Sequence, residues 1–195
     1  EMCIRDSLIP PPPGIYDEML LADGSSRAHY ARYAGWLAQA SAEAMAGKRA
    51  EADLLFRRIG ITFSVYGDES GTERLIPSDV VPRIIPGTEW AHLRRGLVQR
   101  VTAINRFLAD IYHDQAILKA GVIPAEQILA NDQFKVAMIG LKLPFDTYAH
   151  IVGVDIVRHN DGDDDGLEDN LRMPSGVPYM LQSRKVMMSL FPDLF

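Results

Sequence analysis

The chain has 195 residues, of which 47% are hydrophobic and 24% charged, and these proportions are typical of a globular protein. Its net charge of −6 and its dispersed basic residues argue against a surface for nucleic acid or for an anionic membrane. The single cysteine, Cys3, excludes an intrachain disulfide framework, and the apolar runs are too short to span a bilayer. We therefore expect a soluble, cytoplasmic protein, and the composition leaves its oligomeric state open.

The amino-terminal residues 1–13 do not resemble a structured segment. Glu1–Ser7 lacks the apolar core of a signal peptide, and Pro10–Pro13 predicts a stiff, extended lead. We exclude residues 1–13 as a disordered or artefactual leader, assign Cys3 no catalytic role, and treat residues 14–195 as the folded part.

Two helices are predicted next. Ser26 is expected to cap a helix that runs to Gln39, with one apolar stripe formed by Tyr30, Tyr33, Trp36 and Leu37. The second helix is expected to start at Ser41 and to end at Gly60, with an apolar face formed by Leu54, Leu55 and Ile59.

The middle of the chain alternates between strand and helix patterns. Residues 61–66 and 74–76 flank a turn-rich segment, 67–71, and predict a hairpin. Apolar residues at three- and four-residue steps then predict a long helix from Thr88 to Tyr112, with a buried stripe formed by Trp90, Leu93, Leu97, Val101, Ile104, Leu108 and Ile111. The arginines beside this stripe are expected to face solvent, and Pro124 starts a further short helix. Together these patterns predict an α+β fold with helices packed on a mixed or antiparallel sheet.

The polar residues that could form a binding site lie near the carboxyl end of the chain. Residues 148–157 form an apolar, β-branched run interrupted by His150 and Asp155, and residues 160–163 are turn formers. A hairpin across this turn would place Asp155 opposite Glu168, and directly opposed side chains lie about 5 Å apart at Cβ. Because alternate residues of a strand share a face, Asn170 and Arg172 would point the same way as Glu168.

This arrangement is typical of a site for a metal ion and a phosphate. Carboxylate and amide oxygens are the ligands that Mg²⁺ prefers, and a guanidinium binds phosphate oxygens in a fork. Residues 179–190 predict a helix that follows Ser175 and Gly176, and a helix amino terminus favours a phosphate. The same residues can also be explained by a strand-end cap at Asp155 and a solvated turn.

Several segments resemble one known family, and the likeness runs from about Gly14 to Phe195. They are Gly14–Met19, Gly60–Glu69, Pro82–Pro86, Leu167–Gly176, Arg184–Met188 and Leu190–Pro192. The chain is similar here to circularly permuted ATP-grasp proteins of the second type, which are relatives of glutathionylspermidine synthetase. The resemblance implies an ATP-dependent carboxylate–amine ligase that uses Mg²⁺ and ATP and acts on small-molecule or peptide substrates through an acylphosphate.

The resemblance also implies site roles. Asp155, Glu168 and Asn170 match its metal ligands, Arg172 matches the residue beside the transferred phosphoryl group, and Ser175 and Gly176 would contact the nucleotide. Two departures stand out. Asp163–Gly166 replaces an apolar strand entry, so we expect the hairpin to start late or to fray and the site to be weakened. Ser78 replaces an aromatic residue, which would cost core contacts.

Two alternatives stay open. Residues 161–166 match the first half of an EF-hand calcium loop, but Arg172 stands where that loop needs a bidentate glutamate. The chain could also be a non-catalytic module. It has five lysines and no phosphate-cradling glycine-rich loop, so we expect the amino-terminal portion of a permuted ATP-grasp domain, truncated and inactive alone.

Overall fold

The computed structural model describes residues 14–64, 73–75 and 79–194. The expected leader with Cys3, the turn segment 67–71 and Ser78 lie outside the described residues.

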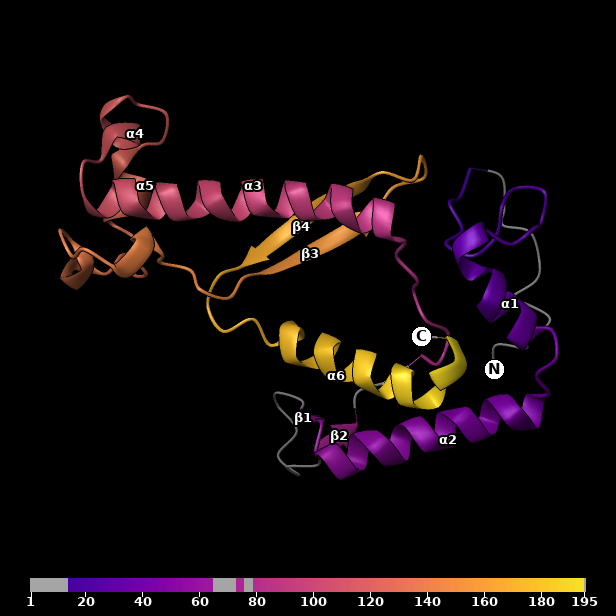
Figure 1. Ribbon diagram of the computed structural model, residues 1–195. Helices are drawn as coiled ribbons and strands as arrows, with labels where there is room; N and C mark the ends of the chain where they lie inside the picture. The colour runs from indigo at the N-terminus through magenta and orange to yellow at the C-terminus, as the bar shows by residue number, and fades with distance from the viewer. Residues whose placement is uncertain (1–13, 65–72, 76–78, 195) are drawn as a thin grey trace. The chain divides into compact units, whose positions relative to one another are not determined.

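Figure 1 shows the helices and strands of the chain. The α-helices are α1 Ala31–Leu37, α2 Ala42–Ile59, α3 Gly87–Tyr112, α4 Ala116–Lys119, α5 Ala125–Leu129 and α6 Gly176–Leu190. The strands are β1 Thr62–Ser64, β2 Glu73–Leu75, β3 Gly153–Arg158 and β4 Asp164–Asn170. Short 3₁₀ helices are η2 Ala28–Tyr30, η3 Val136–Met138, η4 Pro144–Asp146 and η5 Pro192–Leu194. Within the described residues, β1 pairs with β2 and β3 pairs with β4, which confirms the α+β prediction.

The chain divides into two compact units, and each is described by itself. The described part of the first unit lies within Glu1–Pro86, Val157–Asp165 and Ser175–Phe195, and the second unit consists of Gly87–Ile156 and Gly166–Pro174. The β3–β4 hairpin contributes residues to both units.

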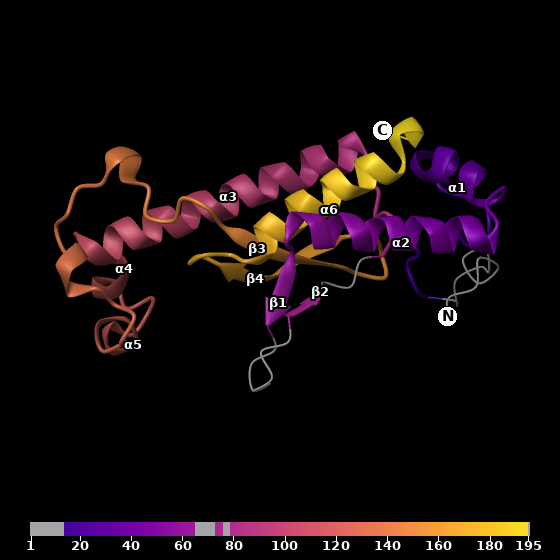
Figure 2. The same cartoon turned by 90° about the horizontal axis from the view of Figure 1, so that it is seen from below.

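Helix α2 begins and ends where the sequence indicates. The Ser41 hydroxyl accepts a hydrogen bond from the Ala44 N–H at 3.1 Å, and this satisfies one of the free donors of the first turn. Gly60 follows the last turn with a φ of 75°, a left-handed conformation that glycine adopts without steric cost. Figures 1 and 2 both show α2 lying beside α6. The core of the first unit forms around these helices from Met19, Leu20, Tyr30, Tyr33, Leu37, Met45, Ala52, Phe56, Ile61, Val80, Val186, Met187, Leu190 and Phe191.

The predicted apolar face of α2 is only partly correct, since Leu55 packs against the core but its two predicted neighbours do not. Leu54 and Ile59 are largely exposed, whereas Met45, Ala52 and Phe56 are buried. Several stripes of α2 contain apolar residues, and contact with α6 selects the one that carries Phe56.

The start of the preceding helix also differs from the prediction. Ser26 pairs with Leu20 in an isolated β-bridge and does not cap a helix. The chain instead enters α1 through the 3₁₀ turn η2, and α1 ends at Leu37. The predicted stripe is nevertheless buried at Tyr30, Tyr33 and Leu37. The hydroxyl of Tyr30 accepts the Ile84 N–H at 2.9 Å, which ties this helical segment to the strand-like segment before α3.

Helix α3 dominates the second unit. Its predicted stripe is buried at Leu93 and Ile111, but Trp90 is half exposed, so the stripe is covered only from the second turn onward. At its other end the Asp110 carboxylate accepts the N–H groups of Ala116 and Ile117, at 2.8 and 2.9 Å, and so caps α4.

The strand predicted from residue 148 begins five residues later, at Gly153. The side-chain oxygen of Asn105, on α3, accepts the N–H groups of Tyr148 and Ala149 at 2.7 and 2.9 Å. These two donors are therefore unavailable to a sheet partner, and the ladder starts beyond them.

Within the part of the chain that the structure describes, no helix is both long and apolar enough to cross a bilayer.

Candidate functional site

The β3–β4 hairpin turns through a tight loop. The Gly162 N–H donates to the His159 carbonyl at 3.0 Å, and the His159 N–H donates to the Asp163 carbonyl at 2.8 Å. Gly162 has a φ of 92°, and a Cβ built on it would lie 2.8 Å from the Tyr16 ring. A glycine is therefore required at this position both by backbone conformation and by packing.

The expected late start or fraying of the hairpin is wrong. Strand β4 begins at Asp164 and includes Asp165 and Gly166. These are poor strand formers, but Asp164 is held by ion pairs with two arginines and is nearly buried. Tertiary contacts thus override the local preference.

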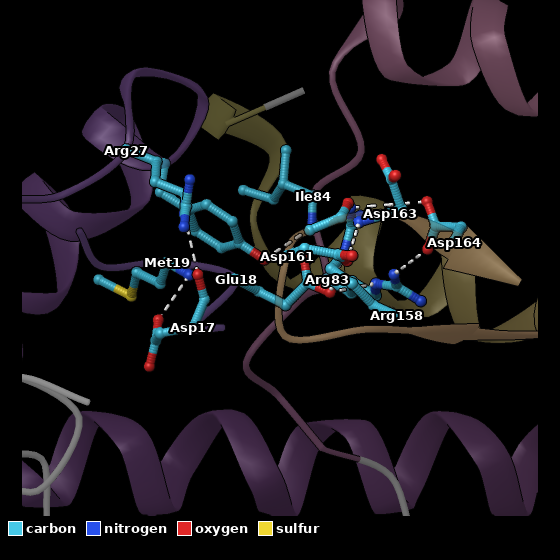
Figure 3. Close-up of polar contacts among 12 residues, drawn as sticks. Asp17, Glu18, Met19, Arg27, Arg83, Ile84, Arg158, Asp161, Asp163 and Asp164 are labelled. Carbon is cyan, nitrogen blue, oxygen red and sulfur yellow. Dashed lines mark hydrogen bonds and ion pairs between the residues drawn. The ribbon is translucent and has the colours of Figure 1, made fainter. Parts of the chain in front are cut away.

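Those contacts form what we call the arginine network, which consists of Glu18, Arg83, Arg158 and Asp164 (Figure 3). The Glu18 carboxylate accepts Arg158 Nε at 2.8 Å and Arg83 Nε at 3.0 Å. Asp164 accepts Arg83 Nη2 at 3.4 Å and lies 3.5 Å from Arg158 Nη1. Arg158 also donates to the Gly162 carbonyl at 2.7 Å. The network joins the hairpin turn to two other segments of the first unit.

Sequence reasoning missed this network. The one local signal was Arg158, a charged residue directly after an apolar run. Its partner Glu18 lies 140 residues away, and no spacing rule relates the two.

Farther along the hairpin, the structure brings Asp155 and Glu168 together on one face, as predicted. Their carboxyl groups are close enough for Glu168 to perturb the pKa of Asp155. Loss of hydration raises the pKa of Asp155, and the neighbouring carboxyl group of Glu168, with its negative charge, raises it further. Two carboxyl groups that lie this close favour the binding of a cation between them.

Asn170 joins the same group. Its side-chain N–H donates to Glu168 Oε1 at 2.9 Å, and all three side chains are exposed to solvent. Asp155 and Asn170 therefore each interact with Glu168, and the role of the three residues as metal ligands stays a prediction. Among the described residues, no cluster of three or more His, Cys, Asp or Glu side chains is placed to hold a metal ion, so the amide would have to supply the third oxygen.

Arg172 does not lie on the strand. Strand β4 ends at Asn170, and the Arg172 guanidinium donates to the Gln133 side chain at 3.4 Å. The next residue, Met173, has a φ of 50°, and the backbone turns away there from the extended conformation. Strand alternation therefore does not set the direction of Arg172.

Ser175 and Gly176 lie at the start of α6. Ser175 occupies the N-cap position without a side-chain capping bond, and Gly176 is the first helical residue. The helix begins three residues before the predicted Tyr179. Whether its amino terminus meets a phosphate stays a prediction.

The calcium-loop alternative would take its ligands from Asp161, Asp163 and Asp165. These residues belong to a hairpin turn, and Asp164, between two of them, is committed to Arg83 and Arg158. Asp161 accepts the Asp163 N–H at 3.1 Å, and His159 pairs with Asp165 at 2.9 Å. These side chains stabilise a turn, and nothing here favours an ion.

Comparisons with known proteins cover the second half of the chain by a family model and nearly the whole chain by individual relatives. Residues 82–195 match the model of a family described as "A circularly permuted ATPgrasp". An uncharacterized protein of Synechocystis is 42% identical over 184 residues, which cover 94% of this chain and 38% of the relative. An uncharacterized protein of Mycobacterium tuberculosis is 42% identical over 183 residues, which cover 92% of this chain and 32% of the relative.

A third relative carries a functional name. The Frankia alni protein named "Putative glutamate--cysteine ligase 2-3" is 37% identical over 187 residues, which cover 93% of this chain and 21% of the relative. The chain thus spans between 21% and 38% of the length of these three relatives.

Proposed function

Because the chain belongs to the circularly permuted ATP-grasp family, we propose that it carries the magnesium-binding corner of an ATP-dependent carboxylate–amine ligase. One observation carries the proposal: two carboxyl groups, Asp155 and Glu168, contact each other on an exposed strand face with Asn170 beside them. The subtype related to glutathionylspermidine synthetase is part of the proposal.

The donor set fits Mg²⁺. The ion takes oxygen ligands, is commonly bound through one or two carboxylates, and fills its remaining positions with water and substrate phosphates. Asp155 and Glu168 would supply the carboxylates, and Asn170 would supply an amide oxygen once its side chain rotates away from Glu168. A divalent cation would also offset the repulsion between the two carboxyl groups.

The proposed reaction joins an acid to an amine. The γ-phosphoryl group of ATP passes to a substrate carboxylate, which gives ADP and an acylphosphate, and the amine then displaces inorganic phosphate to form an amide. Bound Mg²⁺ supplies charge neutralisation on the phosphate oxygens. Arg172, which is exposed, would offset charge on the transferring group, and the backbone N–H groups at Ser175 and Gly176 would bind phosphate oxygens. No protein nucleophile is needed.

The substrates are proposed only as a class. The Frankia relative is named for the ligation of two amino acids, and this agrees with a small-molecule or peptide carboxylate and an amine. Because the chain covers at most 38% of these relatives, we propose that amide formation needs more of the family's chain than these residues. Amide formation coupled to ATP hydrolysis by the 195 residues alone would refute that part.

Calorimetric titration of the chain with MgCl₂, with and without a non-hydrolysable ATP analogue, tests the metal site. We expect saturable binding that is lost in Asp155→Asn and in Glu168→Gln. The matched control is Asp163→Asn, an exposed aspartate in the same hairpin, which should bind as the unaltered chain does. Absence of Mg²⁺ binding under both conditions would refute the proposal. Binding of Ca²⁺ that survives Asp155→Asn but not Asp163→Asn would favour the loop instead.

A further inference from the structure

The two ends of the β3–β4 hairpin differ in register by one residue. At the turn, the hydrogen bond from the His159 N–H to the Asp163 carbonyl places these two residues opposite each other. At the open end, Asp155 contacts Glu168, and a Cβ built on Gly153 would lie 3.6 Å from the Cβ of Asn170.

These pairings require an extra residue in one strand. Four steps along the chain lead from His159 back to Asp155, whereas five lead from Asp163 to Glu168. Strand β3 accordingly has six residues and β4 has seven. The extra residue lies between Asp164 and Glu168, and this is the definition of a β-bulge, a feature that re-aims side chains and is common beside active sites.

A hairpin without this bulge would not assemble the proposed site. Continued regularly from His159 and Asp163, the ladder would place Asp155 opposite Leu167 and would turn Glu168 to the other face. Repulsion between the two carboxylates favours that slip, because like charges directly opposite each other destabilise a sheet. Some other contact must hold the open end in its register.

Arg100, on helix α3, provides that contact. Its Nε lies 2.7 and 2.8 Å from the two carboxylate oxygens of Asp169, the residue between Glu168 and Asn170. The Asp169 side chain is only 19% exposed. Arg100 also covers Gly166, in the bulge segment, where a built Cβ would lie 3.3 Å from the guanidinium. One side chain therefore contacts both the bulge and the residue that faces away from the proposed site.

We infer that Arg100 is a positioning residue for the proposed metal site: by holding Asp169 against α3, it fixes the face of β4 on which Glu168 and Asn170 meet Asp155. The inference deepens the proposed function and rests on it for its metal, but its structural content can be measured without any metal.

The experiment compares Arg100→Gln with Arg106→Gln, an exposed arginine on the same helix, in the full chain. Cross-strand nuclear Overhauser effects report the register directly. We expect contacts between the backbones of Asp155 and Glu168 in the unaltered chain and in Arg106→Gln, and contacts between Asp155 and Leu167 in Arg100→Gln. Mg²⁺ affinity should fall by about 10- to 100-fold in Arg100→Gln, as is usual when a group that orients metal ligands is removed.

Two further variants separate positioning from general stability. Exchanging the charges, as Arg100→Asp with Asp169→Arg, should restore the Asp155–Glu168 contacts. Arg100→Lys should retain these contacts in part. Both variants keep the inference testable if Arg100→Gln does not fold. Unchanged Asp155–Glu168 contacts in Arg100→Gln would overturn the inference. A register shift in Arg100→Gln, in a chain that binds no Mg²⁺, would support the positioning role and refute only the proposed function.

Discussion

The corrected face of helix α2 leads to a sharp test of packing. Phe56 is 1% exposed and contributes to the core of the first unit, whereas Leu54, two residues earlier, is 47% exposed. Replacing a buried phenylalanine by alanine removes apolar contacts and leaves a cavity, and the usual cost is about 3–5 kcal/mol. For Leu54→Ala we expect less than about 1 kcal/mol, because nearly half of that side chain already contacts water.

The assay must report on the first unit alone, since a chain of two units need not unfold in one step. Trp36 belongs to the first unit and lies against Phe191 at a ring-centroid distance of 4.9 Å, and Trp90 belongs to the second. With Trp90→Phe in every variant, tryptophan fluorescence during urea unfolding follows Trp36. A free-energy loss for Leu54→Ala that equals or exceeds the loss for Phe56→Ala would refute the assignment of the buried face.

Three further predictions follow from charge and backbone conformation. The pKa of Asp155 is raised in the folded chain, so the stabilisation from its protonated form is present at acid pH and is lost as the pH rises through that pKa. Asp155→Asn should therefore increase the thermal midpoint of the metal-free chain at pH 7. An unchanged midpoint would contradict the pairing of Asp155 with Glu168. Burial raises the pKa of Tyr33 to about 12, so unfolding monitored by circular dichroism should become easier between about pH 10 and pH 12. Tyr33→Phe should reduce that dependence, and the remainder is expected from Tyr30, whose pKa burial also raises. Phe145 is 98% exposed with a φ of 58°, so Phe145→Gly should leave the free energy of unfolding unchanged or raise it by up to about 1 kcal/mol, and a large loss would show that the ring has a contact in the folded chain.

Features that depend on neighbouring residues could be predicted from the sequence. Ser41 and Gly60 define the ends of α2 because a hydroxyl and a missing Cβ act within one turn of the chain. The hairpin turn is similarly local, since Gly162 supplies the left-handed residue that its loop needs. The pairing of Asp155 with Glu168 was predicted from a regular register, but the structure reaches it through a bulge in β4 that local rules did not indicate.

Features that depend on distant partners could not be predicted. The acidic segment 163–166 was expected to fray, but Arg83 and Arg158 hold Asp164 in the strand. Arg100 is exposed, as expected for the arginines beside the apolar stripe of α3, but its ion pair with Asp169 was not predicted. Arg83 and Arg100 lie 81 and 69 residues from their partners in the chain, where periodicity and spacing carry no information.

By itself, the sequence determined which segments form helices or strands, where most of them begin and end, and the α+β class. It also pointed to the three oxygen-bearing residues on the hairpin, Asp155, Glu168 and Asn170. Only the tertiary structure decided which side of α2 is buried, where β3 begins, and which contacts keep Glu168 facing Asp155. The physical reason is that capping, turn formation and alternation are short-range effects, whereas the choice of a face or a register depends on contact with whichever surface the chain brings against it.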